Sequence, residues 1–203
     1  SYLLMQIYRE AGVPDGVVNF VPGGGSLIGR VALGHRDLAG LHFTGSNRTF
    51  NQLWRGVAER IEHYRAYPRV VGETGGKDFI VVHRSADARA VATAIVRGGF
   101  EYQGQKCAAA SRAYIPRSLW PQVEATLREM TGAIRVGDVA DFRNFMNAVI
   151  DEPAFDTIMG YIGRAKSSPE ARVLVGGQGD KSVGYFIEPT IIVTTNPHFV
   201  TME

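Results

Sequence analysis

The sequence predicts an α/β fold, because short apolar runs alternate with longer helical patterns along its 203 residues. Each apolar run is bounded by glycine, proline or other turn residues, as buried strands usually are. Strands that alternate with helices at this spacing indicate a parallel sheet covered by helices on both faces. The composition, 45% hydrophobic and 21% charged with a net charge of +2, is that of an ordinary globular protein.

The first part of the chain predicts three helices and three strands. Gly12 is followed by Pro14 and favours the end of the opening helix. Ser26 follows a glycine-rich turn and is a suitable N-cap for the next helix, whereas Pro68 stops the third one. The expected elements are a helix over 3–12, a strand over 17–21, a helix over 27–33, a strand over 41–43, a helix over 47–64 and a strand over 69–72.

The second part of the chain continues the alternation of strands and helices. Apolar, β-branched runs indicate the strands, and inward-facing Ala, Val and Ile at helical spacing indicate the helices. A final extended region is interrupted by Pro189, which cannot donate a ladder hydrogen bond. The expected elements are strands over 79–82, 112–115 and 173–175, helices over 87–100, 119–134 and 152–165, and an extended region over 185–194.

The composition also excludes several classes of function. No block of Lys and Arg could follow a phosphate backbone, so we expect no nucleic-acid binding. No apolar run approaches the ~18 residues that cross a bilayer, so we expect no membrane association. The five histidines lack metal-ligand spacing, so we expect no metal site. The single cysteine, Cys107, excludes an intrachain disulfide and is either an inert buried thiol or a reactive one.

Three short motifs could carry chemistry. The first, Phe43 to Ser46, joins a strand to a helix through a Gly-Ser turn, and the N–H groups at such a helix start can bind phosphate. Without a full glycine-rich fingerprint, a simple capped helix is the commoner meaning of this pattern. The second, Glu73 to Lys77, places a carboxylate after a strand and before two glycines. That carboxylate could act as a base, or it could be a solvated group paired with Lys77.

The third motif, Gly104 to Ala110, contains Cys107. A glycine and the cation Lys106 precede the thiol, and small residues that leave room for a substrate follow it. We expect the Lys106 ammonium to favour the thiolate. A lone cysteine among alanines is nevertheless more often a small buried hydrophobe than a nucleophile.

Together and in this order, the three motifs resemble those of the aldehyde dehydrogenase superfamily. Phe43 to Ser46 matches its cofactor-phosphate turn, Glu73 to Lys77 its general-base motif E-[LT]-G-G-K, and Gly104 to Cys107 its nucleophile motif G-Q-x-C. The separation between the base and the nucleophile, 107 − 73 = 34 residues, also fits. Pro22-Gly23 and the stretch Gly184 to Thr190 extend the resemblance over essentially the whole chain.

The resemblance implies a fold, a cofactor and a set of site residues. It implies the C-terminal half of a Rossmann-type NAD-binding domain over residues 1–74 and the N-terminal part of an α/β catalytic domain over 75–203. Cys107 would be the nucleophile, and Glu73 would activate the water that hydrolyses the thioester. The cofactor would be NAD, and the residues implied to bind it are Gly23, Gly45, Ser46 and Thr74.

Within the superfamily the chain most resembles the 1-pyrroline-5-carboxylate dehydrogenases, which oxidise glutamate γ-semialdehyde to glutamate in proline catabolism. Residues 43–54, 68–77, 83–87, 100–107, 116–121 and 182–186 carry this finer resemblance. One residue departs from it, because Ala108 stands where that subfamily often has a serine that helps to hold the substrate carboxylate. Loss of that hydrogen bond, about 1 to 2 kcal/mol, would weaken substrate binding by about tenfold.

Alternatives to this function remain. Ala108 allows another semialdehyde as the substrate, and a thiol hydrolase without a cofactor is a weaker possibility. The chain begins in a helical pattern without a cap, so we expect it to be the central piece of a longer protein. Alone it would have little or no dehydrogenase activity and could serve only in packing or assembly. The full-length protein is expected to be a homo-oligomer, cytoplasmic in a bacterium or in the mitochondrial matrix of a eukaryote.

Overall fold

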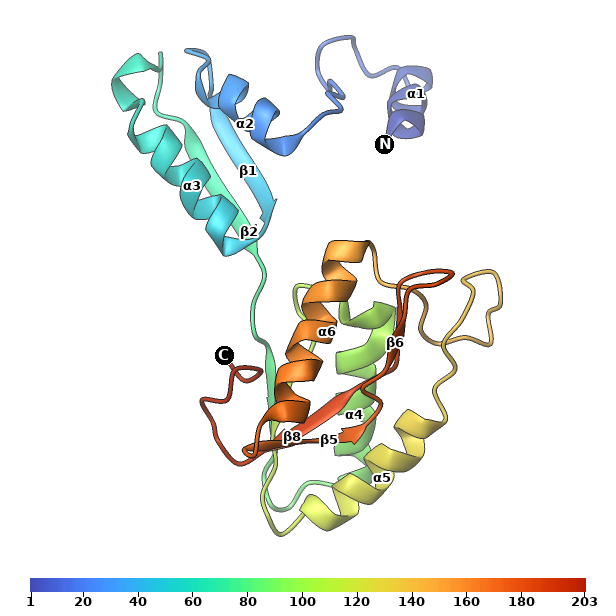
Figure 1. Cartoon of the computed structure of the whole chain (residues 1–203). Helices are drawn as coiled ribbons and strands as arrows, with labels where there is room; N and C mark the ends of the chain where they lie inside the picture. Colours follow the sequence, from blue (N-terminus) through green and yellow to red (C-terminus); the bar gives the residue numbers. More distant parts are fainter. The chain divides into compact units, whose positions relative to one another are not determined.

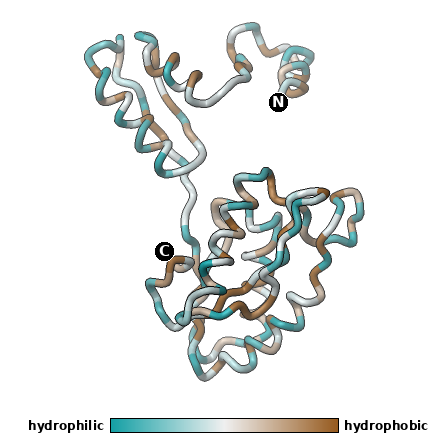
Figure 2. The backbone as a smooth tube through the Cα atoms, in the orientation of Figure 1, coloured by the Kyte–Doolittle hydropathy of each residue, from teal (hydrophilic) through white to brown (hydrophobic).

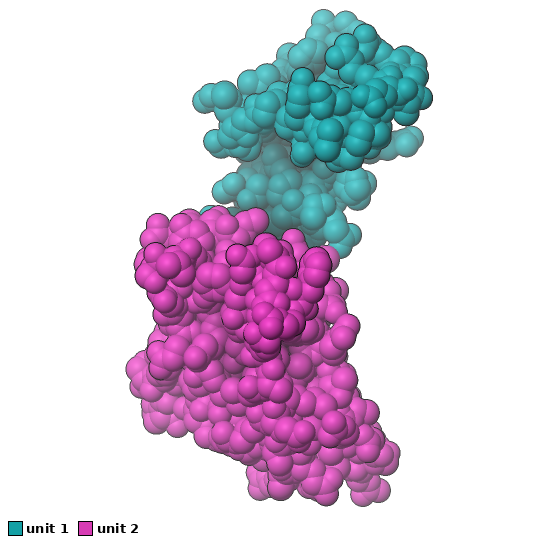
Figure 3. Space-filling model, turned by 90° about the vertical axis from the view of Figure 1, so that its right-hand side faces the viewer, with its two compact units in different colours: residues 1–74 teal, residues 75–203 magenta.

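Two short parallel strands organise the first part of the protein. The computed structural model describes residues 1–203, which divide into two compact units, Ser1–Thr74 and Gly75–Glu203 (Figure 3). No helix in either unit has the length and apolar character to cross a membrane. The elements of the first unit are α1 (Tyr2–Glu10), α2 (Gly25–Leu33), β1 (Gly40–Gly45), α3 (Asn47–Ala58), the 3-10 helix η1 (Ile61–His63) and β2 (Arg69–Thr74).

The first unit has a β-α-β arrangement, as the sequence predicts. β1 and β2 pair in parallel, and α3 connects them and lies along the two strands (Figure 1). A helix is the usual connection between parallel strands, because the chain must return to the same end of the sheet. Glycines allow α2 to pack closely on α3: a Cβ at Gly56 would lie 2.8 Å from the Leu33 side chain.

Three expectations for the first unit are wrong. Residues 17–21 form no strand; Val17 is 67% exposed, and no hydrogen-bonded neighbour strand pairs with this segment. An apolar run becomes a strand only where a ladder partner is present. α2 begins at Gly25 with Gly24 as its N-cap, so Ser26 lies within its first turn. α3 ends at Ala58, well before Tyr64.

The second unit contains four helical elements and six strands. Asp87 and Asp151 cap two of the α-helices, because their side chains accept the N–H of Ala90 at 2.7 Å and of Ala154 at 2.9 Å. The elements are β3 (Phe79–Val81), α4 (Ala88–Phe100), the 3-10 helix η2 (Glu101–Gly104), β4 (Arg112–Tyr114), α5 (Trp120–Gly132), α6 (Glu152–Ser167), β5 (Ala171–Val175), β6 (Gly179–Asp180), β7 (Phe186–Ile187) and β8 (Ile191–Thr194).

The strands of the second unit form separate pairs. β3 and β4 are parallel, whereas β5 pairs with β8 and β6 pairs with β7 in antiparallel fashion. The parallel pairing that the alternation predicts is present in β1–β2 and in β3–β4, whereas the pairs in the C-terminal region are antiparallel. The reason is the path of the chain after α6. β5 follows that helix directly, and β8, later in the chain, runs back alongside β5 and pairs with it. Pro189 separates β7 from β8, as its missing N–H predicts.

The core of the second unit lies between α4 and α5. Ala92 and Val123 are fully buried there, and Leu127 is 1% exposed. Val123 and Leu127 lie four residues apart on one face of α5, which is the amphipathic pattern that favours helix-on-helix packing. A second buried cluster joins α6 to β7 through Phe155, Ile162 and Ile187. Figure 2 shows the hydrophobic character of β8, which is paired with β5 in the same unit.

Candidate functional site

Four of the predicted site residues meet at one edge of the first unit. The strand register pairs Gly45 with Thr74 and Thr44 with Glu73, so both strands reach their carboxyl ends together. Ser46 follows at once as the N-cap of α3. In open α/β sheets, ligands bind just beyond the carboxyl ends of parallel strands. This edge, defined by Gly45, Ser46, Glu73 and Thr74, is called the strand-end edge below.

The start of α3 provides a suitable environment for a phosphate. The Ser46 hydroxyl accepts the N–H of Thr49 at 3.2 Å and donates to Thr49 Oγ1 at 2.9 Å, so its role in the structure is to cap the helix. Arg48 lies exposed in the first turn, which contains no acidic residue. The partial positive charge of a helix N-terminus and a nearby guanidinium both attract an anion.

Gly45 and Gly72 are required by packing inside the first unit. A Cβ at Gly45 would lie 2.5 Å from the Phe43 ring, and a Cβ at Gly72 would lie 2.3 Å from the Phe50 ring. The two phenyl rings stack with centroids 6.2 Å apart. Gly23 is different, since a Cβ there would make only an ordinary contact with Ile28 at 3.4 Å. Gly23 precedes α2 and is not part of the strand-end edge.

Cys107 lies exposed on a turn in the second unit. Its thiol is free, and the N–H of Ala109 donates to the Lys106 carbonyl at 3.1 Å to close the turn. The following residues are anchored to the unit: Ala110 N–H donates to Gly98 at 2.9 Å, and Ser111 N–H donates to Asp78 at 3.1 Å. The interpretation of Cys107 as a buried hydrophobe is therefore wrong, and the thiol is accessible to a reagent or a substrate.

A left-handed bend precedes the Cys107 turn, and the sequence analysis did not predict it. Tyr102 and Gln103 have φ values of 56° and 57°, and Gly104 has a φ of 68°. Non-glycine residues rarely adopt this conformation, which persists where surrounding contacts hold it. Gln103 Nε2 donates to the Ala148 carbonyl at 3.2 Å. Only the glycine signalled the bend in the sequence, because Tyr and Gln are not typical left-handed residues.

Lys106 has a partner that the sequence did not predict. Its ammonium forms an ion pair with the carboxylate of Glu101, which also binds Arg97. The hydrogen bond from Lys106, followed by its positive charge, is the main cause that holds the pKa of Glu101 below its usual range. The positive charge of Lys106 is thus compensated by Glu101, whereas the sequence analysis assigned it to the Cys107 thiolate.

The second motif approaches the Cys107 turn through its glycines. A Cβ at Gly76 would lie 3.6 Å from Asp78 Oδ2 and 3.9 Å from the Cys107 carbonyl oxygen, so this glycine lies beside the turn. The next residue, Lys77, donates from its ammonium to the Thr201 carbonyl at 2.8 Å. Burial, and secondly the nearby charge of Arg112, lower the pKa of Lys77. Lys77 thus serves the second unit's own structure, in contrast to the alternative that pairs it with Glu73.

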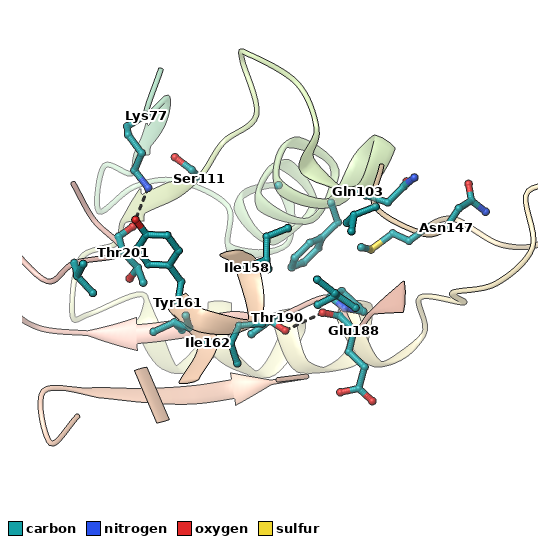
Figure 4. A pocket seen from close by; sticks show the side chains of 18 of the residues that line it. Lys77, Gln103, Ser111, Asn147, Ile158, Tyr161, Ile162, Glu188, Thr190 and Thr201 are labelled. Atoms are coloured by element: carbon teal, nitrogen blue, oxygen red, sulfur yellow. Dashed lines mark hydrogen bonds between the residues drawn. The ribbon is translucent and has the colours of Figure 1, made fainter. Parts of the chain in front are cut away.

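The second unit also contains a cavity of about 470 Å³ with mainly apolar walls. Figure 4 shows Lys77, Ser111 and Thr201 on one side of it and Gln103 and Asn147 on another. Ser111 follows the Cys107 turn and Gln103 precedes it, but Cys107 itself does not line the cavity. No group of three or more His, Cys, Asp or Glu side chains could hold a metal ion.

Comparison with known proteins adds independent evidence. The model of the aldehyde dehydrogenase family matches residues 1–203. The mitochondrial Delta-1-pyrroline-5-carboxylate dehydrogenase of Dictyostelium discoideum is 47% identical over 205 residues, which cover 100% of this chain and 37% of that protein. The human mitochondrial enzyme of the same name is 46% identical over 204 residues, covering 100% and 36%. The chain therefore spans a little over a third of the length of these relatives.

Solved structures show the same fold. The Delta-pyrroline-5-carboxylate dehydrogenase from Mycobacterium tuberculosis, bound with NAD, superposes with a TM-score of 0.93 at 46% identity, covering 98% of this chain and 37% of that one. The Thermus 1-pyrroline-5-carboxylate dehydrogenase with bound NAD gives a TM-score of 0.92 at 29% identity, covering 99% and 38%. These results confirm the predicted aldehyde dehydrogenase-like α/β fold. On the match over its whole length, the chain belongs to the aldehyde dehydrogenase family.

Proposed function

We propose that this chain provides the nucleophile, the general base and part of the NAD site of a 1-pyrroline-5-carboxylate dehydrogenase. Such an enzyme oxidises L-glutamate γ-semialdehyde to L-glutamate, a step of proline catabolism. The relatives at 46–47% identity bear this name, and the solved structure from Mycobacterium tuberculosis contains NAD. Cys107 is proposed as the nucleophile and Glu73 as the base.

One observation carries the proposal: the base motif, Glu73 to Lys77, contains the last two residues of β2 and also the glycine that lies beside the Cys107 turn within the second unit. Glu73 is the register partner of Thr44 at the strand-end edge. In the second unit, a Cβ placed on Gly76 would lie 3.9 Å from the Cys107 carbonyl oxygen. Two residues, Thr74 and Gly75, separate Glu73 from Gly76 in the chain. Gly76 has no side chain of its own to occupy the space beside the Cys107 carbonyl, where a Cβ would make only ordinary van der Waals contacts.

The residues of the first unit fit a dinucleotide. The α3 N-terminus, with Arg48 in its first turn, suits the pyrophosphate, and Gly45 and Ser46 lie directly before it. Thr74 at the end of β2 would line the nicotinamide through its backbone, and Gly23 would lie on the adenine side. When bound, NAD would accept the hydride of the reaction.

The chain's own residues would perform the covalent steps. The Cys107 thiolate adds to the aldehyde carbon, and its backbone N–H is suited to hold the resulting oxyanion. After the hydride has left that carbon, a thioester remains on Cys107. Glu73 removes a proton from water, the hydroxide oxygen adds to the thioester carbon, and the carbon–sulfur bond breaks to release the acid and the Cys107 thiolate. Exposure of both Cys107 and Glu73 is compatible with access of substrate and water.

The finer specificity rests on the neighbour of the nucleophile. Ala108 is exposed next to Cys107 and offers no hydroxyl to a substrate carboxylate. A different semialdehyde dehydrogenase is therefore the second candidate, favoured by this one residue. The full protein is proposed to act on a small aldehyde and to assemble as a homo-oligomer.

NADH formation by the purified full-length protein, of which this chain is proposed to be a part, tests the function. Glutamate γ-semialdehyde should give NADH, and the rate should exceed that with uncharged aldehydes such as propanal. Bound NAD should also protect Cys107 from alkylation. A higher rate with uncharged aldehydes would favour the second candidate. Ester hydrolysis without any dependence on NAD, together with no NADH, would contradict the dehydrogenase proposal.

A further inference from the structure

We propose that Glu101 is a positioning residue for Cys107, because its carboxylate holds the preceding residue, Lys106, against the end of α4. This inference rests on the proposed role of Cys107 as the nucleophile. Glu101 would not touch the substrate and would act only through Lys106 and the turn that follows it.

The Glu101 carboxylate is bound on both oxygens. Oε1 accepts from Arg97 Nη2 at 2.7 Å, and Oε2 accepts from Lys106 Nζ. Arg97 lies on α4, four residues before Glu101, and its guanidinium is 5.9 Å from the centroid of the Phe145 ring. The carboxylate therefore connects the end of a packed helix to the residue next to the nucleophile. Charge-assisted hydrogen bonds of this kind are stronger than neutral ones.

The ion pair spans the left-handed bend. Tyr102, Gln103 and Gly104 separate Glu101 from the Cys107 turn, and all three have positive φ values. A conformation that L residues rarely adopt needs external contacts to persist. Gln103 binds the Ala148 carbonyl at 3.2 Å, and the Gln105 side-chain oxygen accepts the Ile150 N–H at 2.9 Å. The Glu101–Lys106 pair is the charged member of this set and lies nearest to Cys107 in the chain.

The same pair sets the charge on the residue that precedes the nucleophile. Arg97, Glu101 and Lys106 are linked there by ion pairs, and Asp78 Oδ2 lies 3.6 Å from a Cβ placed at Gly76. Removing the carboxylate would leave Lys106 uncompensated, which favours the thiolate. Removing the Lys106 ammonium would leave the negative charge of Glu101 less compensated, which disfavours the Cys107 thiolate. A purely mechanical role would not produce shifts of opposite sign.

The experiment measures the rate of Cys107 alkylation by iodoacetamide between pH 6 and pH 10. Labelling is quantified on the Cys107 peptide by mass spectrometry in the intact protein and its variants. The variants are Glu101→Gln, Lys106→Gln, the double variant and Glu101→Asp. The matched control is Glu124→Gln, because Glu124 also binds two cations, Arg128 and Arg172, but lies on α5.

Glu101→Gln should lower the midpoint of the pH profile by about half a pH unit, and Lys106→Gln should raise it by a similar amount, as expected for half-exposed charges in water. The double variant should return close to the starting profile, and Glu101→Asp and Glu124→Gln should retain it. In turnover, Glu101→Gln should lower kcat about threefold to tenfold with KM within about twofold, since substrate binding is untouched.

Shifts of the same sign in the two single variants would overturn the inference, and so would a Glu101→Gln profile equal to that of Glu124→Gln. If Glu101→Gln does not fold, as judged by circular dichroism, an unshifted Lys106→Gln profile overturns it instead. Alkylation needs no turnover, so the result is separate from the proposed function. Absence of NADH formation by the unaltered full-length protein would contradict the proposed function, whatever the alkylation profiles show.

Discussion

Gly45 and Thr74 face each other as register partners at the carboxyl ends of β1 and β2. The pairing places the start of α3 and the start of the Glu73 motif at the same edge of the first unit. The helix start and the Glu73 residue are thus positioned by the same two strands.

Arg48 is expected to contribute to cofactor binding at the start of α3. Arg48→Gln removes a charge from the first turn and should raise the KM for NAD about twofold to fivefold, the effect of an exposed charge at a helix N-terminus. Arg55→Gln, in the last turn of the same helix, is the matched control. Equal KM values for the two variants would contradict a phosphate site at this helix start.

Gly72 is expected to be essential for the stability of the first unit. A Cβ at this position would lie 2.3 Å from the Phe50 ring, which also packs against Trp54 at a centroid distance of 5.5 Å. Gly72→Ala should therefore lower the free energy of unfolding by about 1 to 3 kcal/mol. A Cβ at Gly25 in the same unit would have no atom within 4 Å, so Gly25→Ala should change the free energy of unfolding by less than about 1 kcal/mol. Thermal and urea unfolding would compare them.

Asp141 should make the stability depend on pH. Its carboxylate accepts two hydrogen bonds of 2.8 Å from the Arg143 guanidinium and a third from the Arg143 backbone N–H. These bonds, the side-chain ones first, lower the pKa of Asp141. A carboxyl with a lowered folded-state pKa stabilises above its unfolded pKa of about 4, and this stabilisation is lost as the pH falls further. Asp141→Asn should thus lower the Tm at pH 7 but have little effect near pH 3.

The control for Asp141 is Glu129→Gln, an exposed residue on α5. Its Tm should match that of the unaltered protein at both pH values. A Tm difference for Asp141→Asn that is as large at pH 3 as at pH 7 would show that the effect is not one of charge.

Ala108 is expected to limit affinity for a carboxylate-bearing substrate. Ala108→Ser adds a hydroxyl beside Cys107 and should lower the KM for glutamate γ-semialdehyde by up to about tenfold. The KM for propanal should remain within about twofold, since propanal has no carboxylate to bind. A similar change for both substrates would assign the effect to the thiol environment.

The sequence predicted most helices and strands because their local signals agree with their packing. The helix expected over 87–100 is α4, with Asp87 as its N-cap, and its apolar face is buried against α5. The segment 17–21 failed because its apolar residues alone do not supply a ladder partner. The strand β6 (Gly179–Asp180) was missed because neither residue has a strand preference, and only pairing with β7 defines it.

The candidate site was predictable only in part. The motifs located the strand-end edge, since Gly45, Ser46, Glu73 and Thr74 follow directly from two parallel strands. The left-handed residues Tyr102 and Gln103 and the Glu101–Lys106 ion pair were not predictable. They depend on contacts between side chains five residues apart around a bend, which no helix or strand periodicity describes.

Trapping of the covalent intermediate tests the central claim most directly. The intact protein carrying Glu73→Gln is mixed with NAD and glutamate γ-semialdehyde, quenched within seconds, and the Cys107 peptide is weighed by mass spectrometry. The proposed roles predict one acyl adduct on Cys107, a single burst of NADH and a steady rate lowered at least about 100-fold. Cys107→Ala should give neither adduct nor NADH. Undiminished steady turnover by Cys107→Ala, or an adduct on another residue, would contradict the claim.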